Sequence, residues 1–152
     1  MILWRITTGA HPVWSDEDAR RHGGRWNVPG QGLIYAALAY STAMLEILIH
    51  ANTGRAPSNA RYVAADISED VAVEALDPAQ LPGWDGADLA IPQAFGAGCW
   101  AEQRSAVLLV PPVVTKVDRN AVVNPAHPDA VRITVSGETP AHWNVRLFPP
   151  RA

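Results

Sequence analysis

Apolar and polar positions along this chain form short runs, which predict many brief elements separated by frequent breaks. Runs rich in β-branched residues are typical of strands. The expected strands are residues 2–7, 33–37, 61–67, 71–74, 106–110, 113–117, 131–135 and 143–148. Because these runs do not alternate regularly with helical segments, they predict an α+β fold rather than a doubly wound sheet.

Three segments predict helices. Residues 14–20 carry acidic side chains that suit the first helical turn, with Ser15 as the N-cap. Residues 42–51 follow Ser41, a second expected cap, and are apolar almost all round, which indicates a helix buried on most sides. A third, short helix is expected over residues 92–102, at the end of a stretch broken by proline and glycine.

The length and composition favour one ordinary domain over residues 1–152 that can bury a real core, since 48% of the residues are hydrophobic and 18% charged. A net charge of −3 argues against a general nucleic-acid-binding protein. The single cysteine, Cys99, excludes an internal disulfide and favours a reducing compartment. It stands beside Trp100 in an apolar segment, so we expect a packed, unreactive thiol. With no signal peptide or membrane span in the pattern, we expect a cytoplasmic protein without membrane contact.

Glu46 is the first candidate for chemistry, because it interrupts the apolar helix expected over residues 42–51. A carboxylate in apolar surroundings is costly unless it is paired. Glu46 could lie on the one wet stripe of the helix or form an ion pair with an arginine. The functional alternative is a carboxylate at the edge of a cleft, where it meets a positive charge that develops during a reaction.

A glycine-rich loop over residues 22–32 and an arginine in the first apolar run are further candidates. Paired glycines let a backbone approach a ligand closely, and Arg25, Trp26 and Asn27 offer a charged fork, a stacking ring and an amide. The loop matches neither a P-loop nor a dinucleotide-binding fingerprint. Arg5 interrupts the N-terminal run, where a simple edge-strand charge is an equal alternative.

Two compositional features bear on the chemistry. Eleven of the twelve basic residues are arginine, which suits phosphate recognition and equally reflects a GC-rich genome. The five histidines show no metal-ligand spacing, and one cysteine cannot build a thiolate site, so we expect no metal.

Several short motifs resemble, in order and spacing, those of the RES-domain family over nearly the whole chain. They are Leu3-Trp4-Arg5-Ile6, Gly23-Gly24-Arg25-Trp26-Asn27, Ile34-Tyr35-Ala36, residues 43–50, Gln93-Ala94-Phe95-Gly96 before Trp100, Leu108-Leu109-Val110-Pro111, Asn124-Pro125-x-His127-Pro128 and Arg146-Leu147. No single motif is decisive, and the joint order carries the resemblance.

The resemblance implies a fold and an activity. The fold is similar to the ADP-ribosyltransferase and diphtheria-toxin catalytic domains, compact, with short, mostly antiparallel strands and several helices. RES proteins are toxins of bacterial toxin–antitoxin pairs, encoded beside an Xre-type helix-turn-helix antitoxin. They cleave the nicotinamide–ribose bond of NAD by hydrolysis or phosphorolysis, and some transfer ADP-ribose to a host protein. The resemblance thus implies NAD as substrate without a metal. Separately, an apolar, proline-rich surface leaves a homodimer open.

The resemblance also implies the site residues. The catalytic candidates are Arg5, Arg25, Tyr35 and Glu46. The candidates for binding NAD are Arg5, Arg25, Trp26, Asn27, Tyr35 and Gln93. In this scheme the Glu46 carboxylate stabilises an oxocarbenium-like ribose, the two arginines clamp phosphate or ribose, and Tyr35 stacks on the nicotinamide ring.

The chain departs from the family at its serine. Val110-Pro111-Pro112 stands where a serine is expected after the apolar strand, and Ile91-Pro92 precedes Gln93. Two alternatives to a NAD-cleaving toxin stay open. One is a nucleotide- or partner-binding module that Pro112 has disarmed. The other is a metabolic enzyme or structural domain in which Glu46 and the arginines form buried ion pairs.

Overall fold

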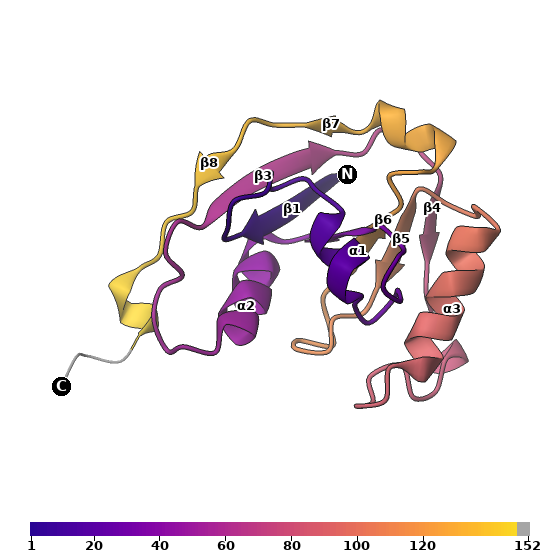
Figure 1. Cartoon of the computed structure of the whole chain (residues 1–152), viewed down its shortest axis with the longest axis horizontal. Coiled ribbons are helices and arrows are strands. Elements are labelled where there is room, and N and C mark those ends of the chain that lie inside the picture. The colour runs from indigo at the N-terminus through magenta and orange to yellow at the C-terminus, as the bar shows by residue number, and fades with distance from the viewer. Residues whose placement is uncertain (149–152) are drawn as a thin grey trace.

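The structure, a computed structural model, describes residues 1–148 and contains one eight-stranded sheet flanked by helices (Figure 1). The strands lie in the order β4-β5-β6-β2-β1-β3-β7, with β8 also beside β3. Every ladder is antiparallel except that between β4 and β5. The α+β class and the mostly antiparallel pairing expected from the sequence are confirmed.

The elements are short, as the many prolines and glycines indicate. The strands are β1 (Ile2–Thr7), β2 (Ile34–Ala37), β3 (Arg61–Asp66), β4 (Val73–Ala75), β5 (Val107–Val110), β6 (Asn120–Val123), β7 (Thr134–Val135) and β8 (Thr139–Pro140). The α-helices are α1 (Glu17–His22), α2 (Tyr40–Ala51) and α3 (Ala90–Ala101), and the 3-10 turns are η1 (Pro78–Gln80), η2 (Pro128–Arg132) and η3 (Val145–Leu147).

Helix starts differ from the predicted caps. α2 begins two residues early, after an extended Ala39 that offers no side-chain cap, so Ser41 lies inside the helix and its predicted capping role is wrong. α1 begins after Asp16, although the Ser15 hydroxyl still accepts a hydrogen bond from the Glu17 N–H at 3.2 Å. Packing of the apolar face of α2, rather than a cap, therefore determines where this helix starts.

The loop between β5 and β6 also differs from the prediction. The strand expected over residues 113–117 is wrong, because Pro111 and Pro112 supply no backbone N–H for a ladder. The Lys116 N–H instead closes a turn onto the Pro112 carbonyl at 2.9 Å. The strand that continues the sheet is β6, which begins at Asn120, three residues after the end of the predicted strand. The apolar pattern does not predict it.

The C-terminal part forms less strand than expected. The strand predicted over residues 143–148 is wrong, because the Asn144 side chain accepts a hydrogen bond from the Arg146 N–H and starts η3. Of the strand predicted over residues 131–135, only β7 forms, since η2 occupies the first two positions. A polar side chain that caps a turn thus overrides a short apolar run.

The sheet has two parts that meet at a narrow seam between β1 and β2. A single residue pair, Trp4 opposite Ala37, forms the ladder between these strands. β1 pairs along its whole length with β3, and β2 along its whole length with β6. Beyond this one pair, β1 and β2 form no backbone pairing with each other. Backbone carbonyls between the two strands are therefore left without a strand partner.

Apolar residues on both faces of the sheet form the core. Along β2 successive side chains alternate: Ile34 and Ala36 belong to one cluster, while Tyr35 packs against a second and Ala37 belongs to a third. α2 packs on β1 and β2 and completes the third cluster (Figure 1). An aromatic group sits there, with the Tyr40 ring centroid 5.5 Å from that of Trp4.

The Asn124-Pro125-x-His127-Pro128 motif forms an anchored turn at the end of β6. The Asn124 side chain accepts a hydrogen bond from the Ala126 N–H at 3.0 Å. His127 Nδ1 accepts from the Asp129 N–H, so Nε2 carries the proton and donates to the Gln103 carbonyl at 3.1 Å. The motif therefore joins the end of β6 to the end of α3.

Two glycines of α3 provide a matched stability test. A Cβ at Gly96 would collide with the backbone carbonyl of Trp26, whereas a Cβ at Gly98 meets no atom within 4 Å. We expect Gly96→Ala to lower the free energy of unfolding by about 1–3 kcal/mol or more. Gly98→Ala should raise it by about 0.5–1 kcal/mol, because alanine is the better helix former. Urea unfolding measures both, and equal effects would contradict the close contact between α3 and the loop.

Candidate active site

Arg5 fills the seam where β1 and β2 part. Its Nη1 donates to the Tyr35 carbonyl on β2 at 2.7 Å, and its Nε donates to the Val13 carbonyl at 2.6 Å. Burial lowers the pKa of Arg5 to about 10, and the charge of Asp18 offsets part of that effect. The guanidinium remains charged at neutral pH, so β1 places a fixed positive charge beside Tyr35.

Tyr35 joins the seam to the glycine-rich loop. Its hydroxyl accepts a hydrogen bond from the Trp26 N–H at 3.0 Å and donates to Asn27 Oδ1 at 2.7 Å. Burial raises the pKa of Tyr35 to about 12, although the Trp26 N–H and the charge of Arg25 act in the opposite direction. Gly24 lies so close to the ring that an added Cβ would be 2.6 Å from the hydroxyl. The phenol is therefore a fixed, protonated element of the site.

Trp26 and Asn27 hold the loop from inside. The Trp26 side chain is only 2% exposed and packs edge-on against Phe95, so the expectation of an accessible stacking ring is wrong. Asn27 is fully buried, and its Nδ2 lies within hydrogen-bond distance of the carbonyls of Ala19, Val28 and Gln31. Neither side chain is accessible to a ligand in this structure, because the core and the loop backbone enclose both.

Gln93 has a similar supporting position. Its Nε2 donates to the carbonyls of Gly24 at 2.9 Å and Asn27 at 3.2 Å. The half-buried amide thereby ties α3 to the loop. Besides the four catalytic candidates, three residues are expected to bind NAD: Trp26, Asn27 and Gln93. The structure thus shows contacts that support the loop for all three.

Arg25 points from the same loop to the segment before α3. Its Nη1 donates to the carbonyls of Trp84 at 2.9 Å and Gly86 at 3.0 Å. These contacts fix one end of the fork and leave Nε and Nη2 as the donors that a ligand could engage. Sequence reasoning misses Trp84 and Gly86, because they contribute backbone carbonyls that no side-chain pattern reveals.

Glu46 lies on α2 and faces the start of β6. Its Oε1 accepts a hydrogen bond from Asn120 Nδ2 at 2.8 Å. Within residues 1–148 it forms no ion pair, so the alternative of a carboxylate neutralised by arginine does not hold for the described part of the chain. The carboxylate is half-buried and meets one neutral donor. Its charge is therefore available to a cationic group that approaches.

The sheet register places the Glu46 contact and Tyr35 on one face. Asn120 lies opposite Ala37, and Val122 lies opposite Tyr35. Residues two apart in a strand share a face, so Tyr35 and Asn120 are diagonal neighbours, at a typical separation of roughly 7–8 Å between such positions. The four catalytic candidates thus group around β2, with Arg5 at the seam, Tyr35 on the strand, Arg25 in the loop and Glu46 above Asn120.

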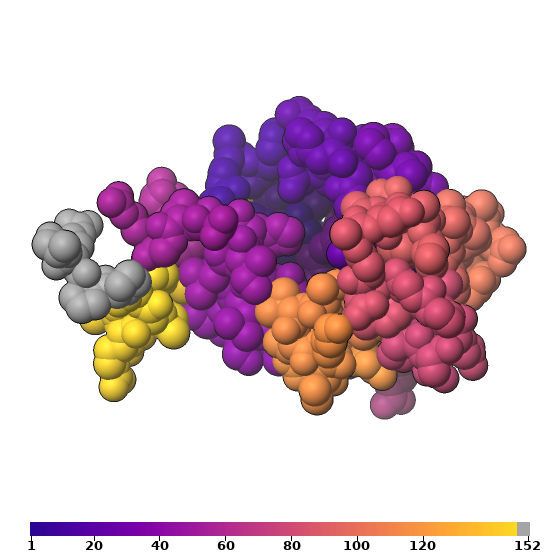
Figure 2. Space-filling model, turned by 90° about the horizontal axis from the view of Figure 1, so that it is seen from below, coloured from indigo at the N-terminus to yellow at the C-terminus, as the bar shows by residue number. Residues whose placement is uncertain are grey.

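Figure 2 views the molecule from below Figure 1 and shows a hollow at the centre of that face. The N-terminal part of the chain (indigo), the α2 region (purple), the segment between β5 and β6 (orange) and the α3 region (salmon) surround it. Two of these parts carry the four catalytic candidates: the N-terminal part carries Arg5, Arg25 and Tyr35, and α2 carries Glu46. We therefore take this hollow as the candidate active site.

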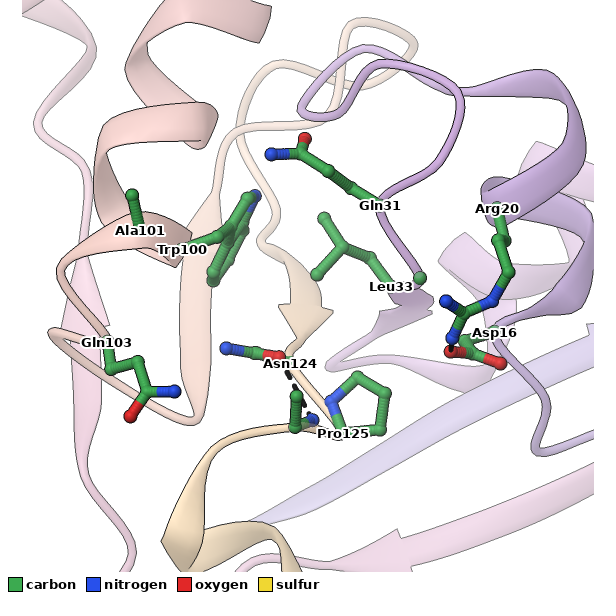
Figure 3. Close-up of a pocket in the computed structure, with 11 residues that line it drawn as sticks. Asp16, Arg20, Gln31, Leu33, Trp100, Ala101, Gln103, Asn124 and Pro125 are labelled. Carbon is green, nitrogen blue, oxygen red and sulfur yellow. Dashed lines mark hydrogen bonds and ion pairs between the residues drawn. The ribbon is translucent and has the colours of Figure 1, made fainter.

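Two surface pockets lie elsewhere. One, of about 460 Å³, is drawn in Figure 3; Leu33, Trp100 and Asn124 line it, together with the ion pair of Arg20 and Asp16. The other, of about 740 Å³, lies beside the C-terminal end of α2. Neither is lined by any of the four catalytic candidates. Pocket size alone would therefore not have located the candidate site.

Other residues noted in the sequence have ordinary environments. Cys99 is fully buried, and burial raises the pKa of its thiol, so the expectation of an unreactive cysteine fits its position. Pro112, which stands where the family serine is expected, is also buried. Among residues 1–148 no three histidine, cysteine, aspartate or glutamate side chains are grouped to hold a metal. In the same range no helix is long and apolar enough to cross a membrane.

Comparisons with known proteins identify the class to which this architecture belongs. The sequence model of the RES domain matches residues 2–147, so the chain belongs to the RES-domain family. The family membership implied by the short motifs is confirmed.

Curated relatives and a solved structure agree with this assignment. The chain is 38% identical over 136 residues to the "Prs ADP-ribosylating toxin" of Sphingobium sp. (strain YBL2), covering 84% of each chain. It is 32% identical over 152 residues to the "Toxin Res" of Pseudomonas putida (strain KT2440), covering 97% of this chain and 100% of the relative. A chain in the crystal structure of the M. tuberculosis MbcT-MbcA toxin-antitoxin complex aligns with a TM-score of 0.74 at 23% identity, over 92% of this chain and 83% of that chain. That likeness confirms the fold.

Tyr35→Phe tests the bridge between strand and loop. Because the variant loses the hydroxyl contacts with Trp26 and Asn27, we expect the free energy of unfolding at pH 8 to fall by about 1–3 kcal/mol. The pKa of Tyr35 is raised from 10.0 to about 12 in the folded state. The stability that the hydroxyl contributes should therefore be present below pH 10 and be lost between pH 10 and 12, and the variant should lack this loss.

Tyr62→Phe is the matched control, since Tyr62 packs in the aromatic group on β3 and its hydroxyl forms no hydrogen bond within the described residues. Urea unfolding between pH 8 and 12 compares the two variants with the wild type. An equal loss of stability in both variants would contradict the bridging role of Tyr35.

Proposed function

We propose that this protein is a NAD-cleaving toxin of a bacterial toxin–antitoxin pair. Membership of the RES-domain family and relatives named as toxins support the proposal. The single observation that carries it is the half-buried Glu46 carboxylate on α2, the helix that borders the hollow. Within residues 1–148 this carboxylate forms no ion pair, and one amide holds it. A site of this kind favours a positive charge that forms only in the transition state.

Glu46 provides the central charge in this mechanism. The bond between the ribose carbon and the nicotinamide nitrogen breaks, and nicotinamide leaves with the bonding electron pair as a neutral molecule. The ribose is left as an oxocarbenium-like cation, and the Glu46 carboxylate stabilises it electrostatically. Water then adds to the carbon and loses a proton, which gives ADP-ribose. Because water is partly excluded around Glu46, the attraction is stronger than in bulk solvent.

The arginines and Tyr35 orient the substrate in the same proposal. Arg25 retains Nε and Nη2 for the pyrophosphate, and the remaining nitrogen of Arg5, Nη2, adds positive charge from the seam. Tyr35 offers part of its ring face to nicotinamide while its hydroxyl stays bonded to the loop. Trp26, Asn27 and Gln93 support NAD binding indirectly, since they fix the loop that carries Arg25.

The acceptor of ADP-ribose distinguishes two versions of the function. Water or phosphate as acceptor gives a hydrolase or phosphorylase that depletes cellular NAD. A protein side chain as acceptor gives an ADP-ribosyltransferase, and the name of the Sphingobium relative favours this version as the second candidate. Both versions use the same first step, the departure of nicotinamide, and therefore the same role for Glu46.

An antitoxin is the partner that this function requires. We propose an Xre-type helix-turn-helix protein that covers the hollow between the glycine-rich loop and α2, in the cytoplasm. The arginines that bind a dianionic pyrophosphate are left under-neutralised when NAD is absent, and an acidic segment could supply that charge while it excludes NAD. A homodimer of the toxin stays a prediction, as does the absence of direct contact with nucleic acid or membrane.

Glu46→Gln tests the mechanism directly. Glutamine keeps the shape and can still bond to Asn120, but it lacks the charge that stabilises the cation. We expect the rate of nicotinamide release from NAD to fall by about 10²–10⁴-fold while the melting temperature stays nearly unchanged. Glu69→Gln, in an exposed turn, is the control and should keep the wild-type rate. A wild-type rate in Glu46→Gln would refute the proposed mechanism.

Expression in bacteria tests the cellular consequence. We expect the wild type to arrest growth, and cellular NAD to fall before growth stops, because nicotinamide release consumes the cofactor pool. Cells that express Glu46→Gln should grow and keep their NAD. Time courses of optical density and total NAD measure both effects. Arrest with unchanged NAD would contradict depletion and favour modification of a specific protein.

A further inference from the structure

Two polar side chains of α2 bond to the segment that leads into β6. Thr42 Oγ1 donates to Asp118 Oδ2 at 2.6 Å, and Asn120 Nδ2 donates to Glu46 Oε1 at 2.8 Å. Thr42 and Glu46 are four residues apart and share one face of the helix. The same two elements are therefore joined twice, once through a contact that includes the candidate catalytic carboxylate and once through a contact that does not.

The backbone of Asn120 is fixed from both sides. It pairs with Ala37 on β2 and with Val110 on β5, in the interior of the sheet. The next two residues of β6, Ala121 and Val122, are fully buried. A short side chain on such a backbone has little freedom, so its amide defines a nearly constant point from which to hold the Glu46 carboxylate.

The other end of the Asn120 amide is unfavourable for stability. Asn120 Oδ1 is buried and has no hydrogen-bond partner in the part of the chain that the structure describes. A buried acceptor without a partner costs about 1–3 kcal/mol, and its neighbours on β6 are apolar. Turning the amide over would place Oδ1 against the carboxylate oxygen of Glu46, which is repulsive. The arrangement is thus retained for the donor that faces Glu46, and such local costs are typical of functional sites.

We propose that Asn120 is the positioning residue for Glu46, and this inference rests on the proposed function. The Asn120 Nδ2 donates to Glu46 Oε1 and thereby fixes the rotamer of the carboxylate. Glu46 Oε2 is then left to face the ribose carbon. Asn120 does not itself touch the substrate in this scheme. It acts by keeping the negative charge at one place, so its loss should lower the rate of the chemical step more than the affinity for NAD.

Asn120→Asp and Asn120→Ala test the proposal with Thr42→Val as the matched control. Aspartate keeps the shape but cannot donate to Glu46 when ionised, and alanine removes both the donor and the unpartnered oxygen. Thr42→Val removes the other hydrogen bond between the same two elements without touching Glu46. For each variant we would measure kcat and KM for nicotinamide release from NAD, and the melting temperature.

We expect both Asn120 variants to lower kcat by about 10–100-fold, the effect of one hydrogen bond to a charged group, with KM changed by less than about threefold. Thr42→Val should lower the melting temperature at least as much as Asn120→Ala and keep kcat near the wild-type value. In the Glu46→Gln background, Asn120→Ala should cause no further loss of kcat, because it acts through the missing carboxylate.

Two outcomes would overturn the positioning role. One is a kcat within about twofold of the wild type in both Asn120 variants. The other is a loss of kcat in Thr42→Val equal to that in Asn120→Ala, which would reveal a merely structural contact. Failure of the proposed function is distinguishable from either, since the wild type would then release no nicotinamide from NAD. Failure of the proposed mechanism would appear instead as a wild-type rate of release in Glu46→Gln.

Discussion

The arrangement of the site depends on the buried guanidinium of Arg5 at the seam of the sheet. One backbone pair, Trp4 with Ala37, connects two groups of strands, and Arg5 bonds to the Tyr35 carbonyl that this sparse pairing leaves available. A charge in such a place is costly, as the lowered pKa of Arg5 indicates. The two backbone acceptors offset part of that cost, and they also fix the distance between β1 and the start of the site.

Tyr35 connects the Arg5 contact at the seam to the glycine-rich loop. One residue bonds to Arg5 through its carbonyl and to Trp26 and Asn27 through its hydroxyl. The loop is then closed from inside by Asn27 and from α3 by Gln93. The three residues that the sequence predicts to bind NAD, Trp26, Asn27 and Gln93, thus form a rigid frame. This frame holds Arg25 at a defined place. Preorganisation of this kind lowers the entropy cost of binding and of reaction.

On the opposite side of the hollow, α2 and β6 present Glu46 in a different way. The helix is anchored by packing on β1 and β2 and by the Thr42 hydroxyl, while the Glu46 carboxylate has only a neutral amide as its partner. An ion pair there would neutralise the charge that the proposed reaction uses. The chain thus combines stable frame contacts with a carboxylate whose charge is kept available, and a buried unpartnered oxygen on Asn120 accompanies it.

The sequence by itself determined the α+β class, the main strands and helices, and the family, and it predicted the four candidate residues that lie around β2. Local apolar patterns carry the elements, and the order of short motifs carries the family. Only the tertiary structure showed that Trp26 and Asn27 are enclosed, because burial depends on α3, which is distant along the chain. It alone revealed β6 and Asn120, since the valine-rich turn before β6 resembles a strand and two prolines prevent its pairing. A contact between Asn120 and Glu46 spans 74 residues, and no local pattern encodes such a distance.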